Sequence, residues 1–587
     1  MANVTRRDFL RAAGITGAGA ALAASAGCSS TAKTASDTST IADVVVYGKI
    51  YTSNASDKYA EAFAVKDGKY VYVGTEDGVS EYVEDGTTTV IDYRDKGLVM
   101  AGATEGHGHY LVAAELVTTG TYLEASSADE IIAGIRSYVE EHPDKNAYFT
   151  QGWLYNGEML ESRHTYNMRA ALDEVCADKP ILMMDDVGHN AFLNSKALDL
   201  AGYTSGFEVE GGSFSKDENG NLLGLVSDVA VNYAMEKVIL QNEIISKSEV
   251  RQAIASAADT LHANGYTNYF DAYTNWFGEA TYEGVKEQDE QAGLTFNMIA
   301  SYKIDPYADI DEKVEIARDY MDRYSSEHFR SNNVKLFADG GAVEVMTGWM
   351  LEGYADGTHG NQVWSDDRMN EIVKKLNEKG VSVHVHASGD GATTQVVNAF
   401  VNAEQTAAEG VYNGLGHSRH ITEETKDMMA EHHIYSATNI CWRYELADTV
   451  EDDKQIMDYE TFLDGYPMKS LIDRGIVMTS STDYPANAGA PTDVCGIIEV
   501  GVNGTLAEGP SIRMAEDEYL SVEEMLDVMT INGAKQFQLE DQRGSIEVGK
   551  YADFLLLDKD ITTCDLDKIH EGKVTKVYFE GVEVYSA

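Results

Sequence analysis

Helix-like and strand-like stretches alternate through the middle of this chain, with a glycine between them. EIVKKLNEKG, at 371–380, is amphipathic and ends in glycine, which signals a helix C-terminus, and the β-rich run VSVHVHAS follows at once. YPMKSLIDRG followed by IVMTSSTDYP, at 466–485, repeats this order. Such alternation predicts an α/β fold in which parallel strands are joined by crossover helices. We expect a closed (β/α)8 TIM-like barrel over residues 99–534.

Both ends of the chain are rich in short β-forming runs. Residues 43–52 and 62–74 read as strands, with Asp67-Gly68 as a hairpin turn between two such runs. Residues 544–558 and 573–586 show the same pattern near the C-terminus. Short strands must bury their apolar faces, so we expect 41–98 and 535–587 to form one small composite β-sandwich domain.

The interval between the first histidine motif and the next candidate site residue is long. His109 and Lys335 are 226 residues apart, whereas three strand–helix units need only about 100 to 130 residues. We therefore expect an insertion near residues 150–230 that caps the barrel, including a hairpin at 211–224 with Asn219-Gly220 at its turn. Trp153, Tyr155 and Trp349 are candidate pocket walls, although aromatic residues more often belong to a core.

Residues able to bind a metal follow several of the predicted strands. The motif EGHGHY is the sharpest signal, because residues two apart on a strand face the same side. Intervals of 51, 34 and 63 residues separate the later candidates, which fits successive strands of a barrel with one strand skipped. All would lie at the carboxyl ends of the strands, where such barrels carry their active sites. The candidates are His107, His109, Lys335, His384, His386, Asp390, His417, His420 and Asp483.

This pattern resembles that of the metal-dependent amidohydrolase superfamily, and more narrowly amidohydrolase family 3, the branch that includes N-substituted formamide deformylase. The resemblance covers nearly all of residues 41–587. VGHNAFLNSKALDLAG at 187–202, VKLFADG, HVHASGD and the run at 521–560 are similar to signatures of that branch. The chain departs from the usual Pro-Gly-Phe-x-Asp before H-x-H, since it reads Ala101-Gly102-Ala103-Thr104-Glu105 there. It also has Ser418-Arg419 before His420, with an extra histidine at His417.

The resemblance implies a hydrolytic metal centre. In that family pattern His107, His109 and Asp483 hold one metal ion, while His386 and His420 hold a second. Lys335 would bridge the two ions as a carbamate, and a mononuclear site is the alternative if Lys335 is not carboxylated. Nitrogen and oxygen ligands without thiolates favour zinc, ahead of manganese, iron or nickel. Asp483 would accept and return a proton during attack by a metal-activated hydroxide, and His189 would donate a hydrogen bond to the substrate oxygen.

We therefore expect a hydrolase that cleaves a non-peptide carbon–nitrogen bond, such as an amide or an N-formyl or N-acyl amine. A deaminase, or an ester or lactone hydrolase on the same fold, is the first alternative. A surface lipoprotein that binds solutes without turnover is the second, although such a protein would not need a general base at Asp483. The substrate would be a small molecule. No cofactor other than a divalent metal is expected, and homodimerisation stays open.

The N-terminus reads as an export signal. TRRDFLR at 5–11 resembles a twin-arginine signal, and Ser25-Ala26-Gly27 before Cys28 resembles a lipoprotein cleavage site. We expect residues 1–27 to be removed, Cys28 to be lipidated and 28–40 to form a flexible tether on an exported, membrane-anchored or periplasmic protein. The twin-arginine export machinery would then be a partner. The net charge of −52 argues against binding nucleic acid or anionic lipid.

Overall fold

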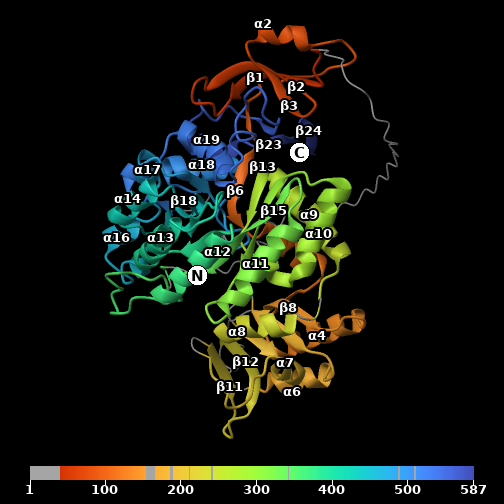
Figure 1. The fold of residues 1–587 in the computed structure, drawn as a ribbon, viewed down its shortest axis with the longest axis vertical. Coiled ribbons are helices and arrows are strands. Elements are labelled where there is room, and N and C mark those ends of the chain that lie inside the picture. The colour runs from red at the N-terminus through yellow and green to blue at the C-terminus, as the bar shows by residue number, and fades with distance from the viewer. Residues whose placement is uncertain are drawn as a thin grey trace.

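The computed structural model describes residues 40–153, 166–185, 190–209, 212–239, 242, 244–341, 343–344, 346–447, 449–486, 489–507 and 511–587. Figure 1 shows three bodies along the long axis of the molecule: a sheet built from both chain ends, a barrel in the middle and a second sheet at the opposite end. None of the helices in the described ranges has the length and apolar character needed to cross a bilayer.

The central body is the expected (β/α)8 barrel. Its eight parallel strands are β6 (Ala103–Gly108), β13 (Tyr266–Asp271), β14 (Asn297–Lys303), β15 (Phe329–Phe337), β16 (Ser382–Ala387), β17 (Gly414–His417), β18 (Tyr435–Thr438) and β20 (Met478–Ser480). They are hydrogen-bonded in this sequence order from β6 to β20. Successive strands after β13 are joined by crossover helices, which is the arrangement predicted from the helix–glycine–strand alternation.

The crossover helices carry clear local signals. They are α9 (Lys247–Ala263), α10 (Glu279–Ala292), α11 (Ile310–Tyr324), α12 (Asp366–Glu378), α13 (Asp390–Glu404), α14 (Glu423–Glu431) and α17 (Met468–Asp473). Ser246 and Glu249 form a capping box at the start of α9. In α12 the apolar residues Met369, Ile372, Val373 and Leu376 recur at helical spacing and are buried, so this helix packs one face on the barrel.

Strands from both chain ends share one sheet, as expected. It contains β1 (Val44–Tyr51), β2 (Tyr59–Lys66), β3 (Lys69–Gly74), β4 (Thr89–Asp92), β5 (Leu98–Ala101), β22 (Phe554–Leu557), β23 (Val574–Phe579) and β24 (Val582–Ser586). β5 joins the two ends, because it pairs with β1 on one side and with β22 on the other. Alternate residues of β1 enter different cores: Val44 and Val46 pack with Phe63 and Phe554, while Val45 packs with Ala62.

The second sheet is an insertion between the first and second barrel strands. Its strands are β7 (Tyr122–Ala125), β8 (Tyr148–Trp153), β9 (Ile181–Asp185), β10 (Asn190–Leu193), β11 (Gly212–Lys216) and β12 (Leu222–Asp228), in the order β11-β12-β10-β9-β8-β7. The sheet thus begins nearer residue 120 than the expected 150. β11 and β12 pair antiparallel across the turn at Asn219-Gly220. Trp153 lies in the core of this sheet, where its ring packs on Phe192 and its Nε1 donates to the Met183 carbonyl, so it is not a pocket wall.

An ion-pair network joins the barrel to the composite sheet. His328, just before β15, contacts Asp289 of α10 through Nδ1 at 2.9 Å and Glu580, in the turn after β23, through Nε2 at 3.2 Å. Arg543 pairs with the same Glu580 and, at 2.6 Å, with Asp553. Burial alone would lower the pKa of His328, but the two carboxylates outweigh burial and raise the pKa to about 9.

This network predicts a pH dependence of stability. A histidine whose pKa is raised in the folded protein contributes stability that is complete below its unfolded pKa of about 6.5 and is lost as the pH rises through about 9. Replacing His328 by Gln should therefore cost on the order of 1–3 kcal/mol of unfolding free energy at pH 6 and much less at pH 9.5. Chemical denaturation at both pH values measures this, with His433→Gln, at an exposed histidine, as the control. A pH-independent cost would contradict the prediction.

Candidate metal centre

The barrel closes between its first and last strands at the level of the histidine motif. The backbone N–H of Asp483 donates to the His107 carbonyl at 2.9 Å, and that of His109 donates to the Tyr484 carbonyl at 2.8 Å. The Glu105 carboxylate accepts hydrogen bonds from the Thr482 N–H at 3.0 Å and the Thr482 hydroxyl at 2.7 Å. These bonds hold the segment after β20 against β6.

Glu105 is a positioning residue, although in the sequence it stands out only as a departure from the family pattern. It is fully buried, and its carboxylate also accepts from the backbone N–H of His107 at 3.1 Å. Burial raises the pKa of Glu105 to about 8, against the opposing effect of its hydrogen bonds. Its place two residues before His107 on the same strand face could have indicated this role.

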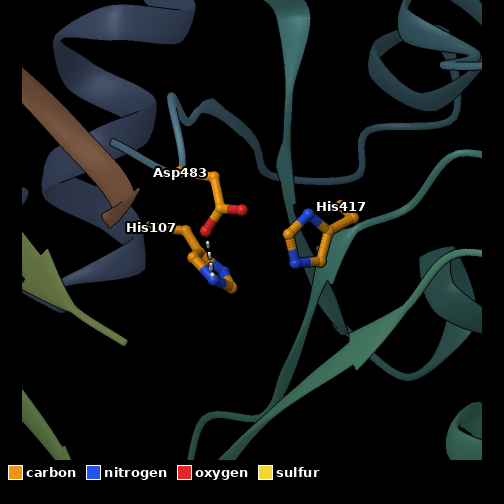
Figure 2. A group of neighbouring side chains, drawn as sticks. All are labelled: His107, His417 and Asp483. Carbon is orange, nitrogen blue, oxygen red and sulfur yellow. Dashed lines mark ion pairs between the residues drawn. The ribbon is translucent and has the colours of Figure 1, made fainter. Parts of the chain in front are cut away.

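Asp483 lies between the two histidines of the motif. Its Oδ1 is 3.1 Å from His109 Nε2 and 3.5 Å from His107 Nε2. Figure 2 shows Asp483 beside His107, with His417 facing them from the other side of the space between the strands. Asp483 and His417 both have left-handed backbones, with φ of 55° and 69°. Such strained positions in non-glycine residues cluster at functional sites.

His384 is hydrogen-bonded to His107 and orients its ring. His107 Nδ1 lies 2.7 Å from His384 Nε2, and His384 Nδ1 lies 2.9 Å from the Tyr435 hydroxyl. Burial lowers the pKa of both histidines, and of His417, well below the usual value. The three imidazoles are therefore neutral at physiological pH, which is the form that binds metals.

The side-chain nitrogen of Lys335 lies beside His107 in the centre of the barrel. It is fully buried on β15, and its Nζ is 3.0 Å from His107 Nε2. Burial lowers the pKa of Lys335 to about 7, although the Asp483 carboxylate opposes this shift. A lysine with so low a pKa has a substantial neutral fraction, and carbamate formation requires a neutral amine.

His386 and His417 form the other side of the centre. Their rings are 4.3 Å apart, and the His417 ring is 4.7 Å from that of His107. Asp339 orients His386 with Oδ1 at 3.3 Å from Nε2. Asn439 fixes His417 with Oδ1 at 2.8 Å from Nδ1. Partners of this kind set the tautomer and direction of a ligating imidazole.

His417, and not His420, is the sixth-strand histidine that the structure places beside His107 and Asp483. His417 is the last residue of β17, whereas His420 lies three residues further and its Nε2 accepts from Arg419 Nε at 3.3 Å. Gly416 makes this packing feasible, because a Cβ there would lie 2.6 Å from His107 Nδ1 and 2.8 Å from His384 Nε2. The position of His417 at the end of the apolar run GLGH was the available signal.

The donor set fits a divalent metal. One ligand atom each from His107, His417 and Asp483 lie within 4.8 Å of one another, and no other such group of three occurs among the described residues. His109, Lys335 and His386 adjoin this group through the contacts above. Neutral imidazoles and a carboxylate suit zinc and related ions.

Several further candidate residues are not assigned to this centre. His189, Tyr155 and Cys28 lie outside the described residues. Trp349 is half-buried, and its backbone N–H donates to Asp339 Oδ2 at 2.9 Å, beside the residue that orients His386. Asp390 begins α13 and accepts from the Leu351 N–H at 2.8 Å. The four described cysteines are free.

Comparison with known proteins places the chain in a family. The family model described as "Amidohydrolase family" matches residues 89–585. The protein YtcJ of Bacillus subtilis (strain 168), whose name assigns it to the amidohydrolases, is 25% identical over 92% of this chain and 98% of its own. N-substituted formamide deformylase of Arthrobacter pascens is 23% identical over 92% of this chain and 98% of its own.

A solved structure shares the fold. An uncharacterized metal-dependent hydrolase from Pyrococcus furiosus superposes with a TM-score of 0.65 over 89% of this chain and 100% of that one, at 21% identity. Because the family model spans the insertion, the barrel and the C-terminal strands of the composite sheet up to residue 585, the chain belongs to the amidohydrolase family.

Proposed function

We propose that this enzyme hydrolyses a non-peptide carbon–nitrogen bond in a small molecule, an amide or an N-formyl or N-acyl amine. The observation that carries the proposal is the Asp483 carboxylate, held within 3.5 Å of both His107 and His109 beside a buried lysine. A carboxylate in that position can serve both as a ligand and as a proton carrier. The similarity to a relative named as a formamide deformylase supports this bond type.

We assign the metal ligands with one change from the family-based expectation. His107, His109 and Asp483 would hold one ion, and His386 with His417 in place of His420 would hold a second, bridged by carboxylated Lys335. A single ion is the alternative if Lys335 stays unmodified. When bound, zinc or a similar ion supplies a Lewis acid and an acidified water molecule.

The protein's own groups would manage the protons. Asp483 accepts a proton from the water molecule that adds to the substrate carbonyl carbon, and it returns that proton to the nitrogen as the carbon–nitrogen bond breaks. The products are then a carboxylic acid and an amine. Glu105 holds the Thr482 backbone that precedes Asp483, so it keeps the proton carrier in place.

Replacing Asp483 by Asn tests the proposal. In Asp483→Asn protein loaded to the metal content of the wild type, loss of the proton carrier should lower kcat by at least about 100-fold, while a substrate or product amine should still bind within a few-fold of its original affinity. Turnover of a panel of N-formyl and N-acyl amines, with calorimetric binding, measures both effects. Undiminished turnover would refute the role of Asp483. Preferential release of ammonia from an aminopurine, or preferential hydrolysis of esters or lactones, would favour the deaminase or esterase alternative.

His417 and His420 make a matched pair for the metal assignment. Loss of a residue that only orients a metal ligand typically weakens metal binding by roughly 10- to 100-fold. His417→Ala removes a direct ligand, so it should weaken metal binding by at least as much. His420→Ala should leave the metal content close to that of the wild type. Metal analysis after dialysis against graded chelator concentrations measures the difference. The reverse ranking would restore His420 as the ligand.

We also propose that the enzyme is exported and anchored by a lipid on Cys28. The support is the order of basic, apolar and small residues before Cys28. Cys28→Ala should move the protein from the membrane fraction to the soluble exported fraction, whereas Arg6→Lys with Arg7→Lys should retain it inside the cell. Fractionation with immunoblotting measures both. An unchanged distribution of the Cys28→Ala protein would contradict lipid anchoring.

A further inference from the structure

A row of three hydrogen-bonded side chains leads from the candidate metal centre into the barrel interior. The Nε2 atom of His107 faces the centre, 3.0 Å from Lys335 Nζ and 3.5 Å from Asp483 Oδ1. Its other ring nitrogen, Nδ1, lies 2.7 Å from His384 Nε2, and His384 Nδ1 lies 2.9 Å from the Tyr435 hydroxyl oxygen. His107 therefore presents Nε2 to the centre and uses Nδ1 for the row.

The barrel strands β16, β17 and β18 leave space for this row. His384, Gly414 and Tyr435 are register partners on these three strands. Because the middle partner is glycine, the Tyr435 ring can cross β17 and reach His384, whereas a Cβ on Gly414 would lie 2.4 Å from ring carbons of Tyr435. Gly416, two residues further along β17, leaves room in the same way for the rings of His107 and His384. A larger residue at either glycine would collide with a member of the row.

All three members of the row are shielded from solvent, with 1% or less of each residue exposed. Phe270 covers His384, with ring centroids 4.6 Å apart. A polar atom buried in this way has no bulk water to replace a lost partner, and leaving it unpaired costs free energy. The positions of the hydrogens on the three groups therefore depend on one another.

The number of hydrogens on each ring decides the direction of each bond. A neutral imidazole carries one N–H donor and one acceptor nitrogen. For His107 Nε2 to offer its lone pair to a metal, the single hydrogen of His107 must be on Nδ1 and be donated to His384 Nε2. The single hydrogen of His384 must then be on Nδ1 and be donated to the Tyr435 oxygen. A tyrosine hydroxyl can accept this bond while it donates its own hydrogen, and Tyr435 is also hydrogen-bonded to the Gln536 side chain.

We propose that Tyr435 is a positioning residue for the metal centre, which acts through His384 to keep the hydrogen of His107 on Nδ1 and the lone pair of Nε2 directed at the metal. The opposite tautomers of the two histidines would place a hydrogen on His107 Nε2 and block that ligand atom. The inference rests on the proposed ligation of a metal by His107. It gives a role to β18, a strand that supplies none of the proposed ligands.

Replacing Tyr435 by Phe tests this role. Without the hydroxyl, the metal-free protein can shift the His384 hydrogen to Nε2 and avoid a buried unpaired N–H. The metal-loaded protein cannot, because His384 Nε2 must accept from His107. The variant should therefore bind Zn²⁺ about tenfold or more weakly than the wild type, measured by competition with a chromophoric chelator. The control Tyr70→Phe removes a buried hydroxyl that donates to the Asp553 carbonyl in the composite sheet, and it should leave the affinity unchanged.

A double-mutant cycle separates this role from a general loss of packing. In His384→Gln the side-chain carbonyl can accept from His107 Nδ1–H, and an amide has no second tautomer for Tyr435 to set. Adding Tyr435→Phe to His384→Gln should therefore change the Zn²⁺ affinity by less than about twofold. An equal loss of affinity with His or Gln at position 384 would mean that Tyr435 acts through packing, and it would overturn the proposal.

Neutron diffraction from crystals of the perdeuterated, zinc-loaded wild-type enzyme provides a test that needs no variant. It should show deuterons on Nδ1 of both His107 and His384. A deuteron on His384 Nε2, or a Tyr435 hydroxyl that donates to His384 Nδ1, would overturn the proposal, as would Tyr435→Phe protein that binds Zn²⁺ as tightly as the wild type. If His107→Ala instead keeps the wild-type Zn²⁺ affinity, the proposed metal assignment is wrong and this inference fails with it.

Discussion

The site depends on the seam between the first and last strands of the barrel. Hydrogen bonds from the Asp483 and His109 backbones, together with the Glu105 carboxylate, attach the segment after β20 to β6. Without this seam Asp483 would have no fixed position relative to His107, from which it is separated by most of the chain. The composite sheet reinforces the arrangement, because β5 leads directly into β6 and pairs with β22 from the C-terminus.

Burial prepares the chemistry of the centre. Burial of His107, His417 and Lys335 disfavours their charged forms. The three neutral side chains can therefore lie close together without the repulsion that their charged forms would cause. Contacts with His384, Asn439 and Asp339 then orient the rings of His107, His417 and His386, respectively. The metal-binding capacity of the barrel mouth thus follows from its packing.

Much of this arrangement could be predicted from sequence because it has a period or a fixed register. The helix–glycine–strand alternation predicted the barrel, and the β-rich chain ends predicted their shared sheet. The two-residue spacing of His107 and His109 predicted a shared face, and both reach Asp483. Other features depended on tertiary contacts. The choice between His417 and His420 follows from where β17 ends, and the role of Glu105 follows from Thr482, far away in sequence. The sequence alone does not distinguish Trp153 from a pocket residue, because its burial depends on how the insertion sheet packs.

The most direct measurement is the position of the metal in crystals of the purified enzyme, located by anomalous scattering at the zinc or manganese absorption edge. The account predicts a strong peak within bonding distance of His107, with Asp483 or His417 as a further ligand, at the mouth of the barrel. A metal-loaded crystal with no peak there, or with its metal bound by a different set of residues, would contradict the central claim.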